Sequence, residues 1–198
     1  MINLHCYQNN LFLRFTISTR RFFIHGYVYL FLINFIYINV FLFYSIFGNL
    51  FERFITSIRH IDYTSGFMGT IFTPVYGVAI LVIIFIHNKI KINNKFFKIL
   101  LEIIIYGVVL SLLELVGGIM IENTFNKVFW NYERFKFNIG KYISLETAVL
   151  WGIMSVVILY LVHPLFKKLE KHIPKFLTLL VSVFFIINLI YVFIVKLT

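Results

Sequence analysis

The stretch at residues 99–121 reads ILLEIIIYGVVLSLLELVGGIMI, and it decides the fold class of this chain. A helix needs ~20 mainly apolar residues to cross ~30 Å of hydrocarbon, and this run is long enough. Further apolar runs lie at residues 27–50, 68–86, 143–162 and 176–195. The sequence therefore predicts an all-α, polytopic membrane protein, a bundle of about five transmembrane helices.

The composition supports this interpretation, because 61% of the 198 residues are hydrophobic, only 13% are charged, and the mean hydropathy is +0.91. A water-soluble domain of this size needs far more polar surface to cover its core. No linker rich in Pro, Gly or Ser divides the chain. We therefore expect residues 1–198 to form a single transmembrane domain whose main partner is the lipid bilayer.

The net charge of +10 indicates membrane topology rather than a nucleic-acid partner, because the basic residues form short clusters between the apolar runs. With the amino terminus inside, the segments facing the cytoplasm hold most of the Lys and Arg residues: Arg14, Arg20, Arg21, Lys89, Lys91, Lys95, Lys98, Lys167, Lys168, Lys171 and Lys175. The positive-inside rule then predicts a multi-pass protein of the plasma membrane, with a cytoplasmic amino terminus and an external carboxyl terminus. The first run lacks the short apolar core and cleavage site of a signal peptide, so we expect a retained span.

Cys6 is the only cysteine, which rules out a disulfide within the chain and a cysteine metal site. We therefore expect no metal and no cofactor.

The carboxyl group most deeply placed in an apolar run belongs to Glu114. Burying it in hydrocarbon costs at least ~2.5 kcal/mol, so it is expected to face the bundle interior. Two interpretations stay open: a protonated or hydrogen-bonded packing residue, and a site for a substrate, an ion or a proton. Glu52 and Glu146 would lie at the outer ends of the first and fourth spans, near the same end of the bundle. Glu102, near the inner end of the third span, is expected at the interface.

Other residues have structural interpretations of their own. Small residues on helical stripes, among them Gly107 and Gly152, predict seams where helices approach closely. Pro74, Tyr76 and Gly77 suit the first turns of the second span. Trp130 and Tyr132 are typical of the membrane surface, in an ordered segment that could form a short interfacial helix before the fourth span.

Several short pieces of the sequence carry a resemblance. They are Tyr44-Ser45-Ile46-Phe47-Gly48 followed by Glu52, Gly66-Phe67-Met68, Pro74-Val75-Tyr76-Gly77, Leu113-Glu114-Leu115, Trp130-Asn131-Tyr132, Asn138-Ile139-Gly140, Trp151-Gly152 and His163-Pro164. In this order and spacing, from about Tyr44 to Pro164, the chain resembles the ABC-transporter type IV family of bacterial membrane proteins, also described as CmpB-like. It departs from the family at Thr70-Ile71, where Gly-Pro is usual, at Asn131, where Asp is usual, and near Asn49, where a Trp is common.

The resemblance implies the membrane subunit of a transporter. The chain has no phosphate loop of the form G-x-x-x-x-G-K-[ST], so an ATPase would be a separate polypeptide. Under the predicted topology, one candidate polar pocket open to the outside is formed by Glu52, Pro74, Tyr76, Gly77, Glu114, Trp130, Tyr132, Asn138 and Glu146.

Two alternatives stay open. The first is a membrane enzyme acting on a lipid-linked substrate, with Glu114 and either Glu52 or Glu146 as an acid/base pair, although no motif of a named reaction is present. The second is a non-catalytic scaffold or sensor whose polar faces only pack helices together.

Overall fold

A computed structural model describes residues 35–54, 57 and 69–197 of the chain. The early part of the first predicted span, Met68, the arginines at positions 14, 20 and 21, and Cys6 lie outside the described residues. The chain divides into two compact units, Met1–Tyr37 and Ile38–Thr198. The helices and the site described below belong to the second unit, apart from the first three residues of the first helix.

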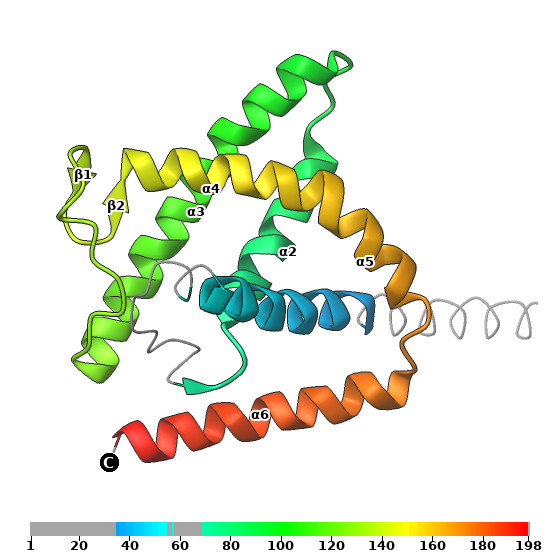
Figure 1. Cartoon of the computed structure of the whole chain (residues 1–198), viewed down its shortest axis with the longest axis vertical. Coiled ribbons are helices and arrows are strands. Elements are labelled where there is room, and N and C mark those ends of the chain that lie inside the picture. The colour runs from blue at the N-terminus through cyan, green and yellow to red at the C-terminus, as the bar shows by residue number, and fades with distance from the viewer. Residues whose placement is uncertain (1–34, 55–56, 58–68, 198) are drawn as a thin grey trace, which may run out of the picture. The chain divides into compact units, whose positions relative to one another are not determined.

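The described part of the chain is mainly helical, as predicted (Figure 1). A helix at Phe35–Phe54 is followed by α2 (Pro74–Lys89) and α3 (Lys95–Phe125). A small antiparallel hairpin of β1 (Asn138–Ile139) and β2 (Ile143–Ser144) comes next. Helix α4 (Leu145–Val157) then continues through the π-helical turn η2 (Ile158–Val162) into α5 (His163–Glu170), and α6 (Lys175–Leu197) ends the described chain.

Four helices among the described residues are long and apolar enough to cross a membrane: Phe35–Phe54, Lys95–Phe125, Leu145–Glu170 and Lys175–Val195. Helix α2 has only 16 residues, which is about 24 Å at 1.5 Å per residue and less than the ~30 Å of hydrocarbon. The span expected at residues 68–86 thus begins later, at Pro74, and ends at Lys89. The described part of this multi-pass membrane protein thus has four long apolar helices and one shorter one.

The helix boundaries follow from local chemistry. The Asn94 side chain accepts hydrogen bonds from the backbone N–H groups of Phe96 and Phe97, which caps the start of α3. Asn126, with φ of 51°, takes the left-handed conformation that ends α3. Pro164 has no N–H to bond the carbonyl of Tyr160, and this explains why the helix widens into a π-turn immediately before it.

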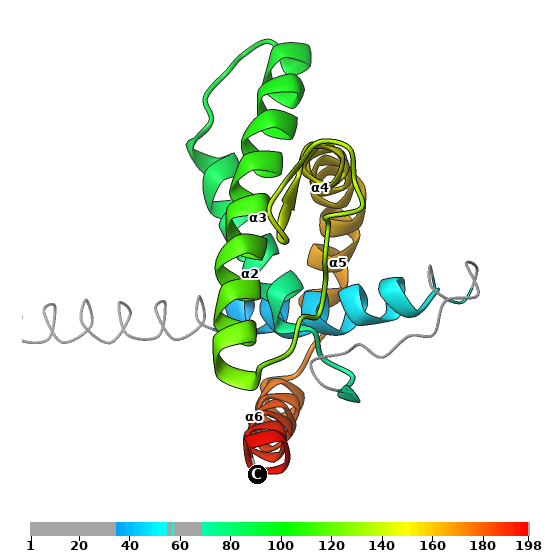
Figure 2. The same cartoon turned by 90° about the vertical axis from the view of Figure 1, so that its left-hand side faces the viewer.

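The small residues form close helix contacts, as the packing interpretation requires. A Cβ atom on Gly152 would lie 2.2 Å from the backbone oxygen of Ile103, and one on Gly107 would lie 2.5 Å from that of Ala148. Figures 1 and 2 show α4 crossing α3. Similarly, a Cβ atom on Gly77 would lie 2.4 Å from Ser45 Oγ, so α2 packs directly on the first helix.

Candidate functional site

The centre of the candidate site is the Glu114 carboxyl group in the second half of α3. The Tyr132 hydroxyl, on the segment after α3, donates a hydrogen bond of 2.7 Å to Glu114 Oε1. Tyr132 is held in place because its backbone N–H donates a 2.7 Å hydrogen bond to the Lys141 carbonyl. Burial and the neighbouring Glu114 carboxylate raise the pKa of Tyr132. Its hydroxyl therefore stays protonated and remains a donor.

A second carboxyl group lies beside the first. The Tyr76 hydroxyl, at the start of α2, donates a short hydrogen bond to Glu52 Oε1 on the first helix. Glu52 interacts electrostatically with Glu114, and Glu114 does so with the Tyr76 hydroxyl. Three helices and one loop thus bring two carboxyl groups and two phenols together.

Trp151 on α4 completes this cluster. Its ring packs edge-on against the Tyr76 ring, with centroids 6.2 Å apart. Its indole N–H interacts with the Glu114 carboxyl and the Tyr132 hydroxyl. The geometry falls short of a hydrogen bond, however, because both Trp151 Nε1 and Glu114 Oε2 are buried without a partner. A buried polar atom without a partner costs about 1–3 kcal/mol, so the cluster is costly in free energy at these two atoms.

A cavity of about 250 Å³ adjoins the cluster between the first helix, α2, α3 and α4–η2. Tyr76 and Trp151 belong both to the cluster and to the cavity wall. The rest of the wall is mainly aromatic and aliphatic: Tyr44, Phe47, Gly48, Phe51, Ala79, Ile80, Ile83, Leu110, Met154, Ser155, Val157, Ile158 and Val162. The cavity is therefore mainly apolar, and the acidic groups of the cluster adjoin its wall at Tyr76 and Trp151.

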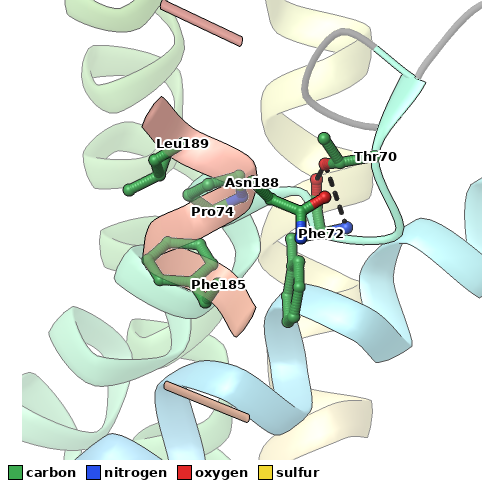
Figure 3. A pocket seen from close by; sticks show the side chains of 6 residues that line it. All are labelled: Thr70, Phe72, Pro74, Phe185, Asn188 and Leu189. Carbon is green, nitrogen blue, oxygen red and sulfur yellow. Dashed lines mark hydrogen bonds between the residues drawn. The ribbon is translucent and has the colours of Figure 1, made fainter. Parts of the chain in front are cut away.

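Two predicted site residues have packing roles at the start of α2. Pro74 is the first residue of that helix and contacts a group of side chains that includes Phe72 and Phe185 of α6 (Figure 3). The space among these side chains is too small to admit a water molecule. Gly77 is the contact point with Ser45 on the first helix. Pro74 and Gly77 fix the first turn of α2, and this turn carries Tyr76.

Apart from Glu146, which is in the first turn of α4, the remaining predicted site residues lie on the segment after α3, and this segment differs from the expected short helix. It is an extended loop ending in the β1–β2 hairpin. Trp130 packs against Tyr142, with ring centroids 6.0 Å apart, and Asn138 donates to the Gly140 carbonyl within the hairpin turn. Glu146 accepts a hydrogen bond from the Phe137 backbone N–H. Trp130 and Asn138 therefore pack at the hairpin and Glu146 joins it to the start of α4, whereas Glu52, Tyr76, Glu114 and Tyr132 share one cluster.

A second polar cluster lies about 18 Å along α3 from Glu114, at 1.5 Å of rise for each of the twelve intervening steps. Glu102 was expected at the interface, but its side chain is fully buried. His87 Nδ1 lies 2.7 Å from Glu102 Oε1, and the Tyr160 hydroxyl donates a 3.0 Å hydrogen bond to Glu102 Oε2. The Lys98 ammonium lies 3.8 Å from Glu102 Oε1. The connection between α2 and α3 is short, so the end of α2 lies beside the start of α3. This feature of the sequence could have indicated that His87 and Glu102 meet.

Within residues 35–54, 57 and 69–197, no group of three potential His, Cys, Asp or Glu metal ligands comes together.

The fold and the clusters together define a polytopic helical membrane protein with acidic groups inside its bundle. The chain belongs to the family described as "putative ABC-transporter type IV", whose model matches residues 39–197. Searches of curated proteins and of solved structures find no match. The family membership confirms the resemblance drawn from the sequence and supports a transport-related role in a membrane.

Proposed function

We propose that this chain is the membrane subunit of a transporter, and that the cavity beside Glu114 is its substrate site. The observation that carries the proposal is the cavity of about 250 Å³ lined by four helical segments. Its wall includes Tyr76 and Trp151, the two rings that contact the acidic cluster. Ionisable groups inside a membrane bundle are expensive and typically mark substrate or ion pathways.

Accessibility of the cavity from the two sides of the membrane tests this proposal without knowledge of the substrate. A transporter exposes one site alternately to each side, whereas a packing seam is exposed to neither. Ser155 lines the cavity and is only 3% exposed, so a cysteine at this position reports on it. The experiment uses Ser155→Cys in a Cys6→Ser background, in sealed vesicles of both orientations, with a thiol reagent that cannot cross membranes.

We expect the cysteine at position 155 to be modified from both sides. Cysteines at Asn93 and Asn126, both exposed in loops, serve as controls that the reagent should reach from one side only. Modification of position 155 from one side alone, or from neither, would argue against a transporter.

The energy source is proposed to be a separate ATPase that docks on the basic loops between helices. The α2–α3 connection exposes Lys89, Lys91 and Lys95, and the α5–α6 connection exposes Lys171 and Lys175. Under the predicted orientation both connections face the cytoplasm. Affinity purification of the cross-linked chain from its host membranes should recover a protein with a phosphate loop. Charge reversal by Lys91→Glu with Lys95→Glu should reduce that recovery, while the same change at the external Lys127 should not.

A further inference from the structure

The chemistry of the cavity wall restricts what the cavity can hold. Five of its lining side chains are aromatic: Tyr44, Phe47, Phe51, Tyr76 and Trp151. The face of an aromatic ring carries partial negative charge, and cations placed over it are attracted. A cage of such rings is the usual protein surface for a quaternary or protonated ammonium group. The wall therefore suits an apolar ligand that is neutral or positive, and disfavours an anion.

The acidic groups next to the cavity wall favour a positively charged ligand over a neutral one. Glu114 Oε2 is buried and has no hydrogen-bond partner, next to the wall residue Trp151. Glu114 forms no ion pair with another described residue, and the groups that interact with its carboxyl are Tyr132, Trp151, Glu52 and Tyr76, none of which is a cation. A buried carboxylate is normally compensated by positive charge. Because no cation among the described residues compensates Glu114, a bound cation would stabilise its ionised form.

The size of the cavity sets a limit on that ligand. A volume of about 250 Å³ lies just below the 300–1,000 Å³ that is usual for ligand pockets, so the ligand has to be small.

We propose that the cavity binds a small organic cation, an ammonium group on a compact apolar body, between the ring of Trp151 and the other aromatic side chains of the wall, with Glu114 as its countercharge. The cation's role as transported substrate rests on the proposed function. Its binding does not, because binding is measured on the purified protein without a second membrane face.

Three molecules of nearly the same shape and different charge test the proposal. Choline is the cation, 3,3-dimethylbutan-1-ol is its neutral carbon analogue, and 3,3-dimethylbutanoate is a related anion. Radiolabelled choline is equilibrated by dialysis with the full chain in detergent, and the other two are added as competitors. We expect saturable choline binding, at least a tenfold higher concentration of the alcohol for the same displacement, and no displacement by the anion.

A pair of matched variants assigns the countercharge. Glu114→Gln removes the carboxylate but keeps its size, and it should weaken choline binding at least tenfold and abolish the preference over the alcohol. Glu133→Gln makes the same chemical change on the exposed loop, where Glu133 bonds Asn131, and should leave binding unchanged. Size-exclusion chromatography checks that both variants are folded.

Absence of saturable choline binding, or equal displacement by the neutral alcohol, would overturn the proposal. These comparisons are made on the unaltered chain, so they decide the matter even where Glu114→Gln fails to fold. If choline binds as expected but the cavity is reached from one side only, the cation site stands and the transporter assignment falls. If the cavity is reached from both sides without cation preference, the reverse holds.

Discussion

The hydroxyl of Tyr132, on the loop after α3, donates a 2.7 Å hydrogen bond to the carboxyl group of Glu114, eighteen positions earlier inside that helix. Phenolic side chains near membrane surfaces commonly serve as interfacial anchors. This one instead reaches back to a carboxyl group within an apolar helix. The contact ties the loop to the candidate site, so removing it should affect both stability and cation binding.

Tyr132→Phe keeps the ring but removes the donor to Glu114. We expect the free energy of unfolding in detergent to fall by about 1–3 kcal/mol, because Glu114 Oε1 is left without its partner. Tyr191→Phe on the exposed face of α6 is the matched control, since that side chain is 59% exposed. Equal effects of the two substitutions, measured by denaturant titration, would show that the hydrogen bond adds no stability.

The buried pair of His87 and Glu102 should show strong energetic coupling. A double-mutant cycle with His87→Ala and Glu102→Gln should give a coupling energy of about 0.5–3 kcal/mol, because the two side chains meet at 2.7 Å with Glu102 fully buried. The exposed pair of Lys141 and Glu122, 2.6 Å apart, should couple more weakly, because water and salt screen charges at the surface. Additive effects at His87 and Glu102 would contradict the observed contact.

The same substitution to alanine should have opposite effects on stability at two glycines. Gly152→Ala should destabilise the protein by about 1–3 kcal/mol, because overpacking forces the backbones of α4 and α3 apart at Ile103. A Cβ atom on Gly117 would lie 3.7 Å from the Trp130 ring, an ordinary contact. Gly117→Ala should therefore leave stability unchanged or raise it by up to about 1 kcal/mol. Thermal unfolding of the two variants in the same detergent compares them directly.

The predicted orientation places the α2–α3 connection in the cytoplasm and the segment after α3 outside. An impermeant thiol reagent applied to intact cells should modify a cysteine at Asn126 but not one at Asn93, both in a Cys6→Ser background. Permeabilised cells, in which both positions should react, control for accessibility. The opposite labelling pattern would invert the orientation and place the acidic cluster near the cytoplasm.

The sequence by itself determined that the chain is helical and membrane-embedded, and where most of its helices lie. Hydropathy and helix length are local and additive, so residues 99–121 and 176–195 predict membrane helices without reference to the rest of the chain. The same locality explains why Glu114 could be singled out, since an acidic residue in an apolar run is visible without its surroundings. It also explains why Pro74 could be assigned to the first turn of α2, since proline suits the start of a helix.

Only the tertiary structure decided which groups meet. Tyr132 bonds Glu114, and Glu102 is buried against His87 and Tyr160. Asn138 bonds within the hairpin turn, while Glu146, in the first turn of α4, accepts a hydrogen bond from Phe137. Each of these outcomes depends on the path of a loop and on the helix faces that pack together. The pattern of hydrophobic residues does not encode either of them. Close approach at Gly77, Gly107 and Gly152 sets the distances between helices, and these distances place carboxyl groups, phenols and aromatic rings around one cavity.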